Sequence, residues 1–139
     1  MRNKVFLDTN ILLDLLISAR TNSKNTIKAI NEFVAKNYIL VVDSISLATI
    51  SYIGSEKNNM WSQTKEFLKG IVFDDDLWEI YYPDKSCDEQ ILNFMDKNVG
   101  LDYEDLHQYF CAKFAKCKFI ITNDKNFPNI DIKLVRTNQ

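Results

Sequence analysis

The sequence predicts an α/β fold in which a central parallel sheet lies between two layers of helices, a three-layer α/β/α sandwich. Short apolar runs alternate along the chain with longer segments of helical periodicity. The short runs are almost continuously apolar, as strands covered on both faces require. The 139 residues include only three glycines and two prolines, which disfavours an all-β fold with many turns. We expect one domain over residues 1–139.

The N-terminal part begins with a predicted strand over residues 4–7, an apolar run that stops at polar residues 8–10. These polar residues suit the start of a helix. Apolar residues at helical spacing then predict helices over 11–17 and 25–36. A second apolar run predicts a strand over 38–42.

The remaining elements follow the same alternation. Residues 71–73 fit either an extension of the preceding helix or a short strand. Gly54 and Gly70 are expected to end the two helices before them. In order, the chain is predicted to form helices over 45–53 and 58–70, a strand over 78–82, helices over 84–98 and 102–116, and strands over 118–122 and 132–135.

The overall charge of the chain favours no particular class of partner. A net charge of −2 and a pI near 5.4 give no general basic field for nucleic acid, although they leave room for a local basic face. Three cysteines without a C-x-x-C pair indicate reduced thiols. No run approaches the ~18 apolar residues of a membrane span, and the N-terminus does not resemble a signal peptide. We expect a cytoplasmic protein that does not contact membranes.

Acidic side chains follow several of the predicted strands. Asp8 follows the first strand, Asp43 the second, and Asp124 the strand over 118–122. Sites in parallel sheets form at the carboxyl ends of strands, so we expect these side chains to converge. Converging carboxylates repel one another, and Mg²⁺ or Mn²⁺ with oxygen ligands removes that conflict. The lone histidine and scattered cysteines argue against zinc, and the glycines form no phosphate-binding loop.

Three segments carry a resemblance to a known family. They are Phe6-Leu7-Asp8-Thr9-Asn10, Asp102-Tyr103-Glu104-Asp105 and Thr122-Asn123-Asp124-Lys125-Asn126-Phe127. In order and spacing they resemble the motifs of PIN-domain ribonucleases, and the resemblance covers nearly the whole chain. It implies a PIN-like fold and metal-dependent endoribonuclease cleavage of RNA phosphodiester bonds. It also implies that the chain is the toxin of a bacterial type II toxin–antitoxin pair, with an antitoxin protein as partner.

The resemblance assigns roles to individual residues. It makes Asp8, Asp105 and Asp124 the catalytic residues and the ligands of Mg²⁺ or Mn²⁺. A supporting set would orient ligands or phosphate: Thr9, Asn10, Thr49, Asn123 and Asn126. Basic residues that could contact the RNA backbone are Arg20, Lys24, Lys28, Lys113, Lys116, Lys118 and Lys125.

Two positions depart from the family pattern and support another function. Thr49 stands where a glutamate is expected, and Asn126 stands where the last motif has its second aspartate. Both replacements remove a negative charge, which favours the alternative of a non-catalytic PIN-like module that binds RNA or protein. A phosphatase with Asp8 as nucleophile is a third hypothesis, but it would need an aspartate at position 10, where the chain has asparagine.

Other polar residues have simpler structural explanations. Asp43 is predicted to cap a helix, Asp102 to cap a helix or remain solvated, and Asp14 to lie near the site or in solvent. His107 follows Asp105 by two residues on a helix, so it is predicted to point away from the site and lie on the surface or at an interface. Trp61 lies in an otherwise polar helix, and this pattern predicts a homodimer with the helices over 45–53 and 58–70 near the contact.

Overall fold

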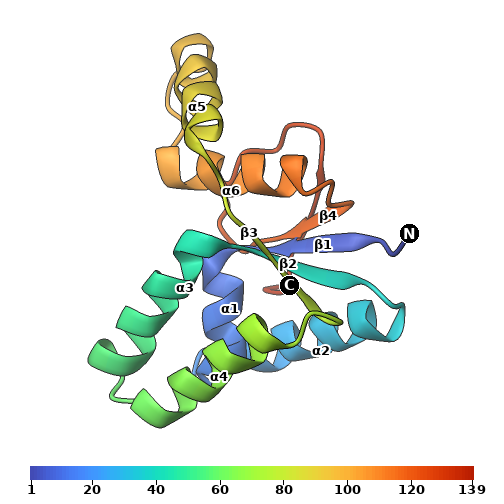
Figure 1. The fold of residues 1–139 in the computed structure, drawn as a ribbon, viewed down its shortest axis with the longest axis vertical. Helices are drawn as coiled ribbons and strands as arrows, with labels where there is room; N and C mark the ends of the chain where they lie inside the picture. Colours follow the sequence, from blue (N-terminus) through green and yellow to red (C-terminus); the bar gives the residue numbers. More distant parts are fainter.

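Five parallel strands form the centre of the structure, a computed structural model that describes residues 1–139 (Figure 1). The strands lie in the order β3-β2-β1-β4-β5. The elements are β1 (Lys4–Leu7), α1 (Thr9–Leu16), α2 (Ser23–Ala35), β2 (Ile39–Asp43), α3 (Ser44–Ser51), η1 (Tyr52–Lys57), α4 (Trp61–Phe73), β3 (Trp78–Tyr81), α5 (Lys85–Lys97), α6 (Tyr103–Phe114), β4 (Phe119–Ile121) and β5 (Lys133–Val135).

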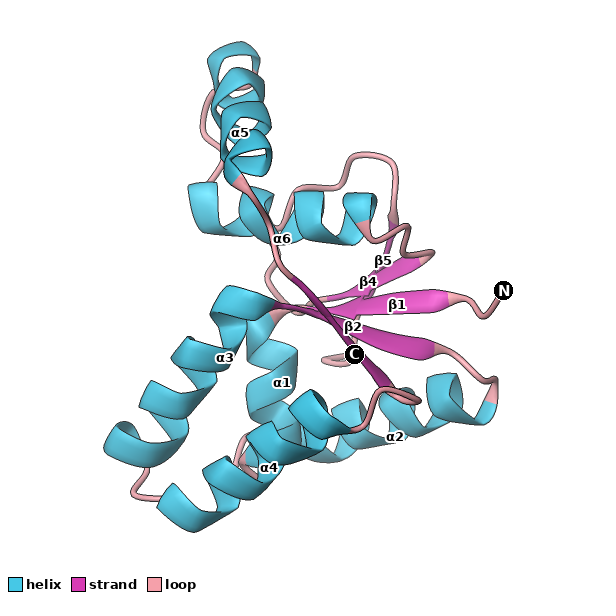
Figure 2. Ribbon diagram, in the orientation of Figure 1, coloured by secondary structure: helices cyan, strands magenta, loops and turns pink.

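The sheet lies between two helical layers, as Figure 2 shows. Helices α1 to α4 cover one face, and α5 and α6 cover the other. Because successive side chains of a strand point to opposite faces, Val5 and Leu7 of β1 pack in one apolar cluster and Phe6 packs in the other. The predicted three-layer sandwich with a parallel sheet is confirmed.

The order of the strands reverses between β1 and β4. From β1 the chain adds β2 and then β3 on one side, whereas β4 and β5 lie on the other side of β1. At the carboxyl ends of this central pair, Leu7 pairs with Ile121. The crevice at such a reversal is where parallel sheets bind ligands. The residues that follow β1 and β4 therefore meet at the edge where a site is expected.

The main difference from the predicted elements concerns the segment around Gly54. The helix expected to end there continues instead as the π-helical segment η1. A Cβ at position 54 would lie 2.3 Å from Thr64 Oγ1 and 2.8 Å from Leu16 Cδ2. The glycine therefore permits close packing and does not end the helix. Residues 71–73 extend α4, which runs to Phe73.

None of the helices combines the length and the apolar character needed to span a membrane.

Gly54→Ala and Gly70→Ala should change stability in opposite directions. Both glycines lie in helical segments, but nothing approaches within 4 Å of a Cβ at Gly70. Gly54→Ala should lower the free energy of unfolding by about 1–3 kcal/mol through overpacking. Gly70→Ala should raise it by roughly 0.5–1 kcal/mol, because alanine loses less backbone entropy on folding. Urea denaturation measures both changes, and an equal gain in both variants would contradict the packing described at Gly54.

Candidate active site

Asp8 occupies the carboxyl end of β1 and is almost completely buried. Its Oδ2 accepts a 2.7 Å hydrogen bond from the hydroxyl of Thr122, which follows β4. Burial raises the pKa of Asp8, and the charge of Asp124 adds to this effect. Hydrogen bonds from Thr122, Gln108 and the Thr9 backbone act in the opposite direction. The Asp8 carboxylate is thus fixed by hydrogen bonds in a buried environment that disfavours its charged form.

Asp105 and Asp124 lie beside Asp8 and complete an acidic cluster. Asp105 is in the first turn of α6, and Asp124 follows β4. Burial, a hydrogen bond with Asp124 and the charges of Asp124, Asp8 and Asp102 together raise the pKa of Asp105 to about 7. Two carboxyl groups can share a hydrogen bond only when one of them carries a proton. The fold therefore brings together the three carboxylates that the sequence singled out.

Gln108 on α6 holds this arrangement, a role that no motif in the sequence indicates. The side chain is 2% exposed. Its Oε1 accepts a 3.0 Å hydrogen bond from the Thr9 backbone N–H, and its amide also hydrogen-bonds Asp8. Gln108 therefore ties α6 to the start of α1. The only sequence signal was its position three residues after Asp105, which places both side chains on one face of the helix.

The predicted supporting residues have different environments. The Thr9 hydroxyl shares a 2.7 Å hydrogen bond with Ser46, and Asn123 exchanges two 2.8 Å hydrogen bonds with Thr137 near the C-terminus. Asn126 is exposed and donates its backbone N–H to Asp124 Oδ1 at 2.9 Å. Thr9 and Asn123 thus hold the framework together, whereas Asn10 is exposed.

Thr49 lies on α3, one turn beyond Ser46. Residues three apart on a helix share a face, and Ser46 shares a hydrogen bond with Thr9. Thr49 therefore lies on the same side of α3 as Ser46, is partly buried and brings a hydroxyl without charge.

The structure supports the predicted helix caps and corrects the placement of His107. Asp43 accepts from Ile45 N at 3.1 Å, and Asp102 accepts from Asp105 N at 3.1 Å. His107 is buried, and its Nδ1 lies 2.5 Å from Asp43 Oδ2, so its predicted surface position is wrong. The reason is that α6 is buried on every side over residues 106–112, between the sheet and α5.

Asp14 belongs to the framework around the site and is not solvated. Its Oδ1 lies 2.6 Å from Arg20 Nε, and its Oδ2 accepts a 2.8 Å hydrogen bond from the Thr26 hydroxyl. The same hydroxyl contacts Thr137 at 2.7 Å. This network fixes the loop between α1 and α2 against the C-terminal segment.

A polar hollow of about 420 Å³ opens beside Asp124. None of its lining side chains is apolar, and they include Asn10, Arg20 and Lys125. Asp14 and Asp124 also line the hollow, and Arg20 is ion-paired with Asp14. Lys125 and the amides are the groups suited to contacts with the phosphates of a nucleic acid.

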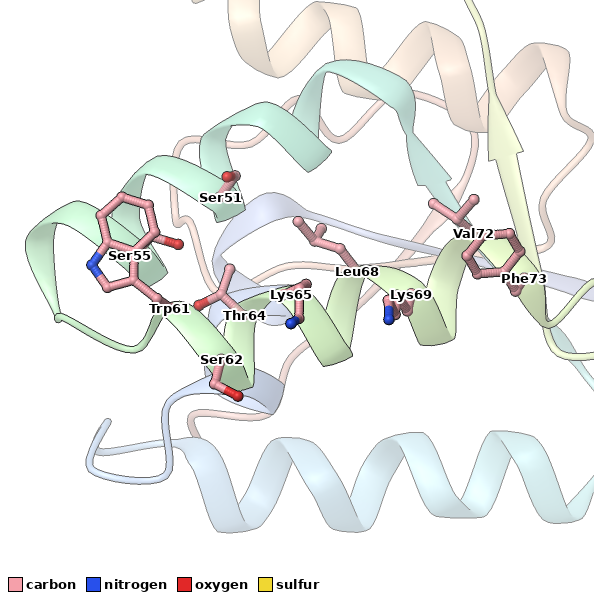
Figure 3. Close-up of a pocket in the computed structure, with 10 residues that line it drawn as sticks. All are labelled: Ser51, Ser55, Trp61, Ser62, Thr64, Lys65, Leu68, Lys69, Val72 and Phe73. Atoms are coloured by element: carbon pink, nitrogen blue, oxygen red, sulfur yellow. The ribbon is translucent and has the colours of Figure 1, made fainter.

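A separate apolar groove of about 670 Å³ lies between the α3–η1 segment and α4 (Figure 3). Trp61 and Phe73 mark its two ends on α4 and are 59% and 78% exposed. Leu68 lines the groove between them, together with Lys65 and Lys69. The groove shares no lining residue with the polar hollow.

Comparisons with known proteins identify similar sequences. The family model described as "PIN domain" matches residues 5–133 of this chain. Ribonuclease VapC1 from Aquifex aeolicus (strain VF5) is 33% identical over 140 residues, which cover 98% of this chain and 92% of that protein.

Solved structures of toxin–antitoxin proteins share the fold. VapBC2 from Rickettsia felis, bound to a DNA fragment from its promoter, matches with a TM-score of 0.65 and 22% identity over 96% of this chain and 98% of that chain. VapC20 from Mycobacterium tuberculosis, a toxin that cleaves the sarcin-ricin loop, matches with a TM-score of 0.70 and 10% identity over 88% and 92%. At these identities the likeness concerns the fold.

Asp105→Asn should stabilise the protein when divalent cations have been removed. In the unfolded chain Asp105 loses its proton near pH 4, whereas in the folded protein it keeps the proton up to about pH 7. The native state therefore loses stability as the pH rises between these values. At pH 8 the variant should melt a few degrees higher than the wild type, and this gain should fade toward about pH 3.5.

Differential scanning calorimetry at the two pH values measures the effect. Asp96→Asn is the matched control, because Asp96 is an exposed carboxylate on α5. Repulsion and burial at Asp105 are contradicted if Asp105→Asn is no more stable than this control at pH 8. They are also contradicted if the rise in melting temperature at about pH 3.5 is as large as the rise at pH 8.

Proposed function

Because this chain belongs to the PIN-domain family, we propose that it is a metal-dependent endoribonuclease and the toxin of a type II toxin–antitoxin pair. The observation that carries the proposal is the convergence of Asp8, Asp105 and Asp124 at the reversal of strand order. A ribonuclease relative that covers nearly the whole chain supports RNA as the substrate.

The acidic cluster suits Mg²⁺ or Mn²⁺. Its three carboxylates supply only oxygen donors, which these hard cations prefer over nitrogen and sulfur. Burial is the main cause of the raised pKa of Asp105, and the neighbouring carboxylates add repulsion that a dication would relieve. Asp8, Asp105 and Asp124 would hold the ion. When bound, it would supply activation of water and neutralisation of charge on the phosphodiester.

The surrounding residues position this cluster and the RNA. Thr122 and Gln108 hold the Asp8 carboxylate in place. Lys125 lines the polar hollow beside Asp124, where it can bind RNA phosphates. Thr49 brings no charge to the position where the family has glutamate, so we expect weaker cation binding than four carboxylates would give.

An antitoxin protein is the partner we propose. The relatives known as toxin–antitoxin complexes support it. We further propose that the protein works in the cytoplasm. The cysteines Cys87, Cys111 and Cys117 are all unpaired and buried, as suits a reducing compartment.

The second candidate function is an RNA-binding module without cleavage. The uncharged Thr49 and the exposed Asn126 favour it, because both reduce the negative charge available to a cation. A chelator distinguishes the two functions. It should abolish cleavage by a metal-dependent nuclease and leave RNA retention by a binding module unchanged.

The apolar groove supports a homodimer. Trp61 and Phe73 lie at opposite ends of α4. A two-fold axis across α4 would pair the helix antiparallel with its copy. Trp61 would then approach Phe73 of the partner subunit. This arrangement covers both exposed aromatic rings.

Asp8→Asn should abolish most RNA cleavage while leaving the fold intact. The change keeps the size of the side chain but removes a charge from the cluster, so activity should fall by about 100-fold. Cleavage of labelled RNA with Mg²⁺ or Mn²⁺ measures it, and circular dichroism checks the fold. Asp96→Asn serves as the control and should cleave like the wild type. Equal cleavage by Asp8→Asn and wild type would refute the assignment of the site.

Trp61→Glu should dissociate the homodimer. Light scattering of the wild type should report about twice the 16.2 kDa of one chain, and the variant should approach one chain mass. Val99→Glu is the matched control, because Val99 is 97% exposed and lies outside the groove. A wild-type monomer over a hundredfold concentration range would contradict the dimer. A dimer unaffected by Trp61→Glu would exclude this groove as the contact.

A further inference from the structure

A second group of metal-ligand side chains lies inside the protein. Asp43, His107 and Cys111 are all buried, and their ligand atoms lie within 4.8 Å of one another. His107 Nδ1 is 2.5 Å from Asp43 Oδ2 and 3.9 Å from Cys111 Sγ. None of the three belongs to the acidic cluster of the proposed ribonuclease.

The fold creates this group from residues far apart in the sequence. Asp43 ends β2, and His107 and Cys111 are four residues apart on α6, so both side chains lie on one helix face. That face packs against β2. Asp43 Oδ1 accepts from Ile45 N at 3.1 Å, which leaves Oδ2 directed at His107.

The charges of the group match a buried divalent cation. A carboxylate and a thiolate contribute two negative charges and a neutral imidazole contributes none, so a dication makes the whole site neutral. This matters because Asp43 has no exposed surface, and an unbalanced charge there would be strongly unfavourable. In the absence of a cation, the proton between His107 and Asp43 provides the balance.

The sulfur donor determines which cation fits. Thiolate and imidazole are typical zinc ligands, whereas Mg²⁺ binds neither well. The scattered cysteines argued against zinc in the sequence, but the fold brings one of them, Cys111, to His107 and Asp43.

We propose that Asp43, His107 and Cys111 bind Zn²⁺, with a water molecule as the fourth ligand of a tetrahedral site. On binding, Asp43 Oδ2, His107 Nδ1 and Cys111 Sγ donate electron pairs to the ion. The Cys111 thiol proton and the Nδ1 proton pass to solvent. The bound ion fastens β2 to α6, which also carries Asp105 and Gln108.

Cobalt substitution tests the proposal directly. Thiolate ligands give Co²⁺ a sulfur-to-metal charge-transfer band, and tetrahedral coordination gives visible d–d bands. The full chain, purified under reducing conditions and stripped of metal, is titrated with Co²⁺ in the presence of excess Mg²⁺. We expect both sets of bands to saturate at one equivalent of Co²⁺, and Zn²⁺ to bleach them.

Matched variants assign the bands to these residues. Cys111→Ser should lose most of the charge-transfer intensity. Cys117→Ser should keep it, because the third buried thiol lies near Lys4 and Glu79 instead. His107→Gln should bind Co²⁺ at least about tenfold more weakly, which keeps the test decisive if circular dichroism shows that Cys111→Ser is unfolded.

Three results would overturn the proposal: a wild type without a charge-transfer band, a Cys111→Ser variant that is folded and retains the band, or equal loss in Cys117→Ser. Asp8→Asn should retain the bands, so this outcome is independent of whether the acidic cluster cleaves RNA.

Discussion

The confinement of like charges at one edge of the sheet is the constraint on which this structure depends. Asp8, Asp105 and Asp124 arrive from β1, α6 and the segment after β4, and their mutual repulsion adds to burial in raising the pKa of Asp105. Free side chains would separate to relieve such repulsion. Here Thr122 and Gln108 fix Asp8, and the backbone fixes the others. Because these three carboxylates cannot move apart, the site binds a dication more favourably than a neutral ligand.

Helix α6 connects this cluster to the rest of the molecule. It supplies Asp105 to the cluster, Gln108 to the junction of β1 and α1, and His107 to the buried Asp43 at the end of β2. A helix buried on every side can make polar contacts in several directions at once, provided that each buried polar group finds a partner. Its position therefore determines the geometry of the acidic cluster and of the buried group around His107 together.

The sequence predicted the features that depend on local pattern. Apolar runs of strand length and helical spacing were sufficient for the layer order. The positions of Asp8 and Asp124 after strands predicted that they converge, and the family resemblance added Asp105. Asp43, which also follows a strand, pairs with His107 instead. His107 was misplaced because the prediction put it on an outer side of α6, whereas that side packs against Asp43 at the end of β2. Gln108 and Gly54 act through contacts with distant segments, which no local pattern contains.

The ionisation of Asp105 tests the central claim most directly. Carbon-detected NMR can follow its side-chain carboxyl through a pH titration of the full chain, with and without Mg²⁺. The account predicts a midpoint near pH 7 without metal and a midpoint several units lower when Mg²⁺ is bound, because the ion stabilises the carboxylate. An ordinary midpoint at about pH 4 that Mg²⁺ does not change would contradict it.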